Sequence, residues 1–101
     1  MTNTTTARGT ATSVQYLTHE GRQGYRLAKS IEKADAMNLS VGGTNATLIK
    51  DISLPVVNEG DDVEVTGAVN SRSGWLEVVA LKDHTSGVEW KFSRAQAAFG
   101  F

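Results

Sequence analysis

The stretch from residue 60 to residue 81, GDDVEVTGAVNSRSGWLEVVAL, has the pattern of two strands joined by a tight turn. In its first half, valines recur on one side at positions 63, 65 and 69, which predicts a strand with one buried face. Gly67 interrupts these valines, and a glycine inside a strand indicates a bulge or a close approach of another backbone. From Trp75 onward the chain is apolar on both faces, as expected for a strand that is covered on both sides.

Similar short alternating runs fill most of the remaining chain. They predict strands around TSVQYLT (12–18), YRLAKSI (25–31), MNLSV (37–41), ATLIKDISLPV (46–56) and VEWKF (88–92), with Pro55 ending the fourth of these runs. The turn sequence GGTN at 42–45 separates two of them in the manner of a hairpin. Ser93 and Gln96 have the spacing of a helix capping box, so one or two helical turns are expected before Gly100.

The composition is that of one small globular domain. The chain has 101 residues, of which 40% are hydrophobic and 21% are charged, and it has no cysteine. Polar residues fill 1–7, which we expect to be a flexible arm, and 8–101 are expected to form a single β-barrel domain. No apolar run is long enough for a membrane helix and the start lacks a secretory core, so we expect a cytoplasmic protein with no membrane contact.

Six or seven short strands with almost no helix predict an all-β fold, a small antiparallel β-barrel, because closing the sheet removes its exposed edges. The expected core includes seven apolar residues: Val14, Leu27, Leu39, Val63, Val65, Val78 and Trp90. The order of a long first strand, an Arg-Gly loop, two further strands and the closing pair at 60–81 resembles the OB-fold. The resemblance covers residues 8–83, and it departs from the OB-fold where a helix is usual, before the fourth strand.

Two four-residue segments share the pattern Arg-x-Gly-aromatic: Arg22-Gln23-Gly24-Tyr25 and Arg72-Ser73-Gly74-Trp75. The OB-fold resemblance implies that they lie on the two loops that such domains use to hold ligands. In a ligand site, arginine contacts phosphate or carboxylate and the aromatic ring stacks, whereas two ordinary hairpin turns need only the glycines. The candidate binding residues are Arg22, Tyr25, Arg26, Lys29, Arg72 and Trp75.

Two function classes follow from these observations. The net charge of −1 favours a non-catalytic module that binds a protein partner, because contact with a nucleic-acid backbone rests on a basic field. The two loops, 19–25 and 70–75, favour weak binding of single-stranded nucleic acid by cations and stacking rings. The oligomeric state is left open by the sequence.

An enzyme and a metal site are both less favoured, so we expect no catalytic residues, no metal and no cofactor. Asp83-His84-Thr85-Ser86 contains the residue types of a hydrolase triad, but four adjacent residues in one turn do not converge on one substrate atom. The acidic turn GDDVEV at 60–65 offers too few ligands for a divalent cation. Phe99 and Phe101 are expected to cover one end of the barrel, or else to present an apolar hook to a partner.

Overall fold

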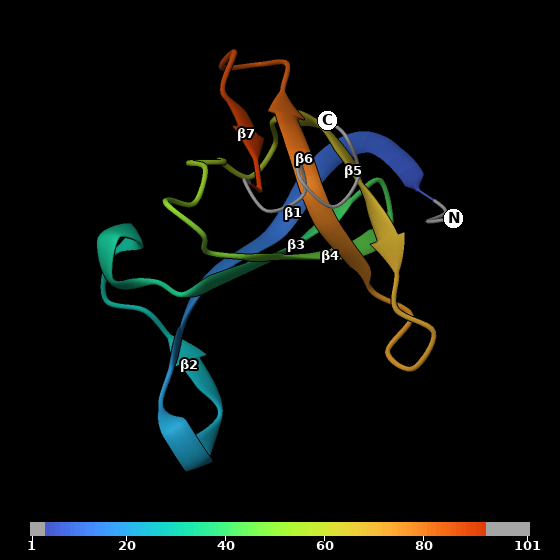
Figure 1. Ribbon diagram of the computed structural model, residues 1–101. Coiled ribbons are helices and arrows are strands. Elements are labelled where there is room, and N and C mark those ends of the chain that lie inside the picture. The colour runs from blue at the N-terminus through green and yellow to red at the C-terminus, as the bar shows by residue number, and fades with distance from the viewer. Residues whose placement is uncertain (1–3, 93–101) are drawn as a thin grey trace.

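The computed structural model describes residues 4–92, which form strands joined by turns and two short 3-10 segments (Figure 1). The elements in chain order are β1 (Thr5–His19), η1 (Gly21–Gln23), β2 (Tyr25–Leu27), η2 (Ile31–Lys33), β3 (Ala36–Val41), β4 (Thr44–Ile49), β5 (Asp62–Val69), β6 (Leu76–Asp83) and β7 (Glu89–Lys91). The predicted all-β class is therefore confirmed. The helical turn expected after Ser93, and Phe99 and Phe101, lie outside the described residues.

Five of the strands follow one another around a closed ring in the order β1-β3-β4-β6-β5, and β5 pairs with β1 to complete it. β2 extends the sheet beyond β1, and β7 pairs with β6. The expectation of a purely antiparallel sheet is wrong at one place, because β4 and β6 run parallel, with Ala46 opposite Leu76 and Thr47 opposite Glu77. Directions cannot alternate all the way around a ring with an odd number of strands, so one neighbouring pair must be parallel.

The long strand β1 takes part in both halves of the ring. Residues 5–10 pair with β5, and residues from Ala11 onward pair with β3. The register with β3 shifts between Thr12 and Gln15, where Ser13 has a φ of 53°. Residues 5–7, which the sequence assigns to a flexible arm, are thus paired as part of this strand.

Gly67 lies where the register between β5 and β6 shifts, as its place among the valines predicts. Thr66 is opposite Ala80 and Gly67 is opposite Val78, so Val79 is the extra residue of a bulge on β6. A Cβ atom on Gly67 would lie 1.9 Å from the carbonyl oxygen of Glu77, so the close approach of a second backbone is also confirmed. The bulge leaves the alternation of β5 unchanged, and Val69 is opposite the buried Leu76, but it is the last residue of the strand and is 53% exposed.

The segment 50–61 corrects the expectation of a strand that continues to Pro55. β4 ends at Ile49, and Ile52 is 83% exposed. The segment is held as a loop by side chains of β1 and β7. The Tyr16 hydroxyl donates to the carbonyl oxygen of Pro55 (2.8 Å) and accepts from the amide of Val57 (3.0 Å), and the Trp90 indole N–H donates to the carbonyl oxygen of Ser53 (2.8 Å). Leu54 and Val57 are buried against the core.

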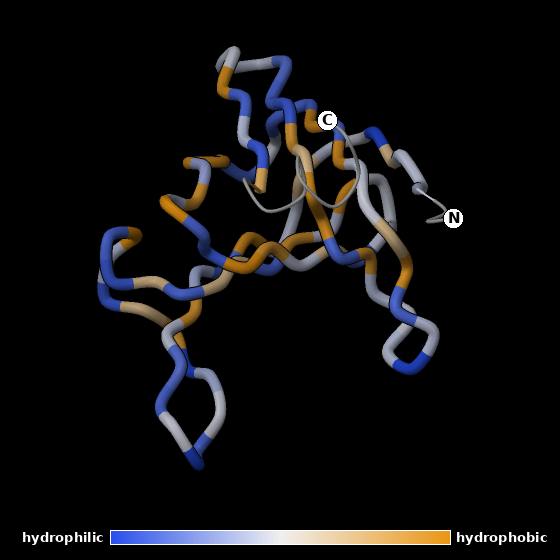
Figure 2. Tube along the Cα trace, viewed as in Figure 1, coloured by the Kyte–Doolittle hydropathy of each residue, from blue (hydrophilic) through white to orange (hydrophobic). Residues whose placement is uncertain are grey.

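The core fills the inside of the ring, and most of the expected core residues are found there. Figure 2 shows apolar residues interleaved with polar ones along the ring strands, whereas the tips of the two long hairpins are hydrophilic. Leu39, Val63, Val65, Val78 and Trp90 are buried, and Val14 is half-buried against them. The prediction that Leu27 is in the core is wrong, because β2 lies outside the ring and leaves this side chain 62% exposed. YRLAKSI likewise forms a strand only over Tyr25–Leu27, and Ile31 begins η2.

Candidate binding face

The register of the strands defines which side chains share the outer face of the ring. Tyr16, Met37 and Leu48 are opposite one another and point inward, since the last two are fully buried and Tyr16 packs against the core. Their neighbours in each strand therefore point outward, because successive side chains alternate between the two faces of a sheet. The outward residues form cross-strand rows on β1, β3 and β4.

One row on this outer face is apolar, and we call it the apolar row. Its members are directly opposite one another in the pairings of four strands: Leu27, Leu17, Ala36 and Ile49. Leu27 is 62% exposed and Ile49 is 49% exposed, whereas Ala36 between them is buried and Leu17 is half-buried, so the row faces solvent at its two ends. Aliphatic side chains aligned in this way pack against one another across the strands.

The next rows on the same face are polar and nearly uncharged. They comprise Gln15, Asn38, Thr47 and Glu77 in one row and Thr12, Ser40 and Asn45 in the other. Glu77 is the one ionisable group among them. Its carboxylate accepts a hydrogen bond from the Asn70 side-chain amide at 3.1 Å. The face therefore offers amides and hydroxyls beside the apolar row, groups that donate and accept hydrogen bonds without a net charge.

The hairpin of β1 and β2 lies at one side of this face. Its turn closes with a hydrogen bond from the Glu20 amide to the carbonyl oxygen of Gly24, whose φ is 78°. Tyr25 is 51% exposed, and its ring meets His19 edge-on with 5.0 Å between the ring centroids. Arg26 points to the reverse side of the hairpin, opposite Thr18, and forms an ion pair with Glu20.

The hairpin of β5 and β6 lies at the other side. Asn70 shapes its turn, because its side-chain oxygen accepts hydrogen bonds from the amides of Arg72 (2.8 Å) and Ser73 (3.2 Å). Gly74 has a φ of 76°, and the Trp75 amide donates to the Ser73 hydroxyl at 3.1 Å. Gly24 and Gly74, the glycines of the two Arg-x-Gly-aromatic segments, thus both adopt the expected positive φ.

The two hairpins project from the same side of the ring, with β3 and β4 between them (Figure 1). Among residues 4–92, no hydrogen bond or ion pair joins one hairpin to the other. Five of the six candidate residues lie on the hairpin turns and strands or immediately beside them as exposed side chains: Arg22, Tyr25, Arg26, Lys29 and Arg72. Trp75 is half-buried. The prediction that they bind a ligand together stays a prediction.

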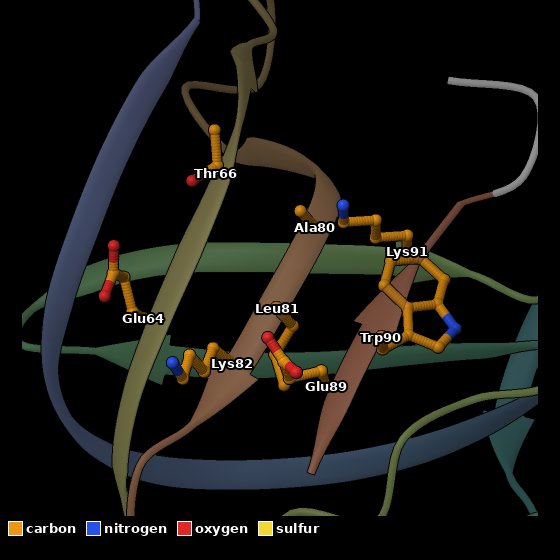
Figure 3. Close-up of a pocket in the computed structure, with 8 residues that line it drawn as sticks. All are labelled: Glu64, Thr66, Ala80, Leu81, Lys82, Glu89, Trp90 and Lys91. Atoms are coloured by element: carbon orange, nitrogen blue, oxygen red, sulfur yellow. The ribbon is translucent and has the colours of Figure 1, made fainter. Parts of the chain in front are cut away.

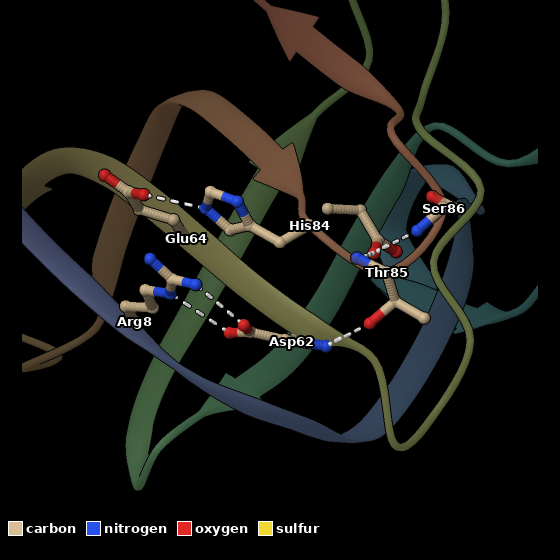
Figure 4. Close-up of polar contacts among 7 residues, drawn as sticks. Arg8, Asp62, Glu64, His84, Thr85 and Ser86 are labelled. Carbon is tan, nitrogen blue, oxygen red and sulfur yellow. Dashed lines mark hydrogen bonds and ion pairs between the residues drawn. The ribbon is translucent and has the colours of Figure 1, made fainter.

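The opposite outer face, on β1, β5, β6 and β7, has a different character. Its cross-strand row alternates in charge, with Arg8, Glu64, Lys82 and Glu89 opposite one another in turn. Arg8 also contacts Asp62 at 2.8 Å, and the His84 ring contacts Glu64 at 2.9 Å (Figure 4). A hollow of about 170 Å³ between β5, β6 and β7 is lined by four charged residues and by four uncharged ones, among them Leu81 and Trp90 (Figure 3). On this face, Arg8 is paired with Asp62 and His84 with Glu64.

The polar side chains of the turn at 83–86 form hydrogen bonds with backbone amides. Asp83 accepts hydrogen bonds from the amides of Thr85 (2.9 Å) and Ser86 (3.0 Å), and the Thr85 hydroxyl accepts from the Asp62 amide at 2.9 Å (Figure 4). Asp83 and His84 are thus turned toward different partners, and His84 contacts Glu64. The absence of catalytic residues stays a prediction.

Asp61 and Asp83 form a pair of carboxyl groups beneath this turn. The hydrogen bond to Asp83 raises the pKa of Asp61, with burial adding to the effect. Burial opposes ionisation of Asp83, but hydrogen bonds from Asp61 and from the Ser86 and Thr85 amides outweigh it and lower its pKa. Asp83 Oδ2 is buried without a hydrogen-bond partner, and a protonated Asp61 is the neighbouring group that would supply a donor to it.

Within the described part of the chain, no three His, Asp or Glu side chains are grouped as they would be around a metal ion. The same residues contain no helix of the length and apolarity needed to cross a membrane. Comparison of the chain with protein-family models, with curated proteins and with solved structures finds no match.

The sequence did not indicate the apolar row, although it did indicate the two hairpins. Leu17 and Ile49 are separated by more than thirty positions, and only the pairing of β1, β3 and β4 brings their row together. One local signal was present. The polar positions that alternate with the apolar ones in MNLSV and TNATLI are all amides or hydroxyls, whereas those of VEV and VEWK are charged.

Proposed function

We propose that the ring is an OB-type barrel and that its outer face on β1, β3 and β4 is a binding site. An OB-fold is a five-stranded Greek-key barrel that binds ligands on its second and third strands, between the first and fourth interstrand loops. The order β1-β3-β4-β6-β5 supports this assignment if β2 is an addition to the first loop. The two hairpins then occupy the positions of the ligand loops, and the segment 50–61 occupies the position of the usual helix.

We propose further that the domain is a non-catalytic module that binds a protein partner on this face. The observation that carries the proposal is the apolar row, with Leu27 62% and Ile49 49% exposed beside uncharged amides and hydroxyls. Apolar side chains aligned between polar groups are typical of the centre of a protein interface, where charged residues are depleted. The charged face of the same ring lacks these properties.

Cations are scarce on the proposed face, which favours a protein over a nucleic acid. Arg26 is directed to the reverse side of its hairpin and is paired with Glu20. Glu77 adds a negative charge to the face itself. Arg22 and Arg72 are exposed at the two hairpin turns. A phosphate backbone gains most of its affinity from a larger set of cations.

Site-specific photo-crosslinking tests the proposal. A benzophenone side chain is placed at Ile49 on the apolar row or, as the matched control, at Lys82 on the charged face, and the protein is irradiated in extract of its source cells. A partner crosslinked from Ile49 is then purified and titrated. Ile49→Lys should weaken its binding at least about tenfold, since an apolar contact is lost and a charge is desolvated.

Ile52→Lys is the control substitution, because Ile52 is also exposed but lies outside the apolar row. It should leave the affinity for the purified partner unchanged. Equal crosslinking from Ile49 and Lys82, or equal loss of affinity in the two isoleucine variants, would refute the proposed face.

Single-stranded nucleic acid is the second candidate, favoured by one observation: each hairpin carries an aromatic residue, Tyr25 or Trp75, with an exposed arginine nearby. Bases stack on such rings with about 1 to 3 kcal/mol each. Fluorescence anisotropy with labelled oligonucleotides at low salt tests it. Trp75→Ala should weaken binding to all sequences, and Arg72→Ala should also reduce the salt dependence. No binding at low salt removes this candidate.

A further inference from the structure

β2 is an edge strand with an unpaired side. It is the terminal strand in the order of the sheet and is paired with β1 alone. The Ala28 amide donates to the carbonyl oxygen of Tyr16, and the Glu20 amide donates to that of Gly24. Both bonds belong to hydrogen-bonded residue pairs, and in an antiparallel ladder such pairs alternate with pairs that are not hydrogen-bonded. Arg26 is therefore the residue of β2 whose own N–H and C=O face β1.

The N–H and C=O groups of Tyr25 and Leu27 consequently point away from β1, toward solvent. No backbone hydrogen bond between described residues uses them. Edges of this kind are usually protected by charged side chains or proline, because they accept another strand. Here the two residues are apolar or aromatic and are 51% and 62% exposed. Their side chains lie on the outer face, in line with Leu17 and His19.

The charge around this edge indicates what kind of strand it accepts. Residues 20–33 contain four Lys or Arg and two Asp or Glu. Two copies of the hairpin would bring these positive segments together, and like charges disfavour that pairing. An incoming strand with acidic side chains has the complementary charge. An acidic segment of another protein is therefore favoured over a second copy of this chain.

We propose that the free edge of β2 binds an extended acidic peptide of a protein partner as an added strand. Backbone hydrogen bonds join the peptide to Tyr25 and Leu27. Its apolar side chains lie beside these two residues on the outer face, and its acidic side chains lie on the reverse side, where they compete with Glu20 for Arg26. The inference rests on the proposed function, since the added strand extends the apolar row outward from Leu27. Because β2 has three residues, few backbone bonds form and the alternating side chains determine the specificity.

A titration followed by NMR tests this. The probe is a short blocked peptide of alternating valine and glutamate, added to ¹⁵N-labelled protein. The amide signals of Tyr25 and Leu27 should shift, and their hydrogen exchange should slow at least about tenfold on binding. A peptide of alternating valine and lysine is the charge control, and it should bind at least about tenfold more weakly.

N-methylation of the peptide separates strand addition from mere side-chain contact. In an added strand, alternate amides face β2, so methylating one alternating set should abolish binding and methylating the other set should not. Equal binding of the two methylated peptides overturns the proposal. So does a concentration-dependent dimer in sedimentation that Leu27→Pro dissolves, since a second copy would then occupy the edge.

Leu27→Pro removes one outward N–H and keeps the bonds to β1, so it is compatible with an edge strand. Leu27→Ala also removes the leucine side chain, but it retains the N–H. Proline should reduce peptide affinity at least about threefold more than alanine, and equal losses overturn the proposal. If the peptide shifts Asn38 and Thr47 but neither Tyr25 nor Leu27, strand addition fails and the proposed face stands. If it shifts no signal and Ile49 crosslinks to no partner, both fail.

Discussion

Replacing Gly67 by alanine is expected to destabilise the ring by about 3 kcal/mol. The new Cβ would lie 1.9 Å from the carbonyl oxygen of Glu77 and 2.9 Å from the Cα of Val78, and both are backbone atoms that no side-chain rotation removes. To reach an allowed contact of 3.0 Å, β5 and β6 must separate by at least about 1 Å at the bulge. That movement disrupts two or three ladder hydrogen bonds at about 0.5 to 1.5 kcal/mol each and loosens the packing of Val78.

Urea unfolding followed by the fluorescence of Trp75 and Trp90 measures this loss. Gly74→Ala is the matched control, because Gly74 also has no Cβ but has open space around it. Its φ of 76° makes the control cost about 1 to 2 kcal/mol through backbone strain alone. A Gly67→Ala variant that is no less stable than Gly74→Ala would refute the close approach of β5 and β6.

Three further predictions concern the core and the carboxyl pair. Tyr16→Phe should cost about 2 kcal/mol in urea unfolding, since it leaves the Pro55 carbonyl and the Val57 amide without their partner; a loss below about 0.5 kcal/mol would contradict it. Leu39→Ala should cost about 2 to 5 kcal/mol, and Ile52→Ala should stay within about 0.5 kcal/mol, because the first side chain is buried and the second is exposed. Asp61→Asn should match the parent near pH 4 and exceed its stability near pH 7, as measured by urea midpoints across that range.

The sign of the last prediction follows from the raised pKa of Asp61. A raised pKa in the folded state contributes stability at low pH and loses it as the pH rises through that value. The lowered pKa of Asp83 acts in the other direction, so its contribution is lost as the pH falls. An asparagine at 61 keeps a donor toward Asp83 at every pH and an acceptor for the Asn58 amide. A parent protein whose stability does not fall between pH 4 and pH 7 relative to this variant would contradict the raised pKa of Asp61.

Features that depend on neighbouring residues were predictable from the sequence. Gly67 among valines indicated the bulge, and the alternation of Trp90 with charges placed its ring in the core. Features that depend on distant partners were not. Ile52 continues the alternation of β4, but Tyr16 and Trp90 bind the carbonyl oxygens of the following segment and hold it as a loop. Val69 stays in phase with Val63 and Val65, but it is the last residue of β5, where little of the ring covers it, and it is exposed.

The candidate site was predictable to the same extent. The two hairpin turns were located from Gly24 and Gly74, because positive φ is a local requirement. The direction of Arg26 was not, since it is set by its pairing opposite Thr18 and by Glu20. The apolar row needs the registers of three separate strand pairs, none of which is written in a short stretch of sequence.

The parallel pair of β4 and β6 is the shortest strand pairing in the ring. Two residue positions join these strands, whereas six or seven join most other neighbours around the ring. Thermal opening should therefore begin at this seam, between Thr47 and Glu77. The polar row of the outer face crosses the seam at these two residues. A ligand that spans this polar row would contact both β4 and β6. Its binding should raise the melting temperature, because it stabilises the strand pair that separates most readily.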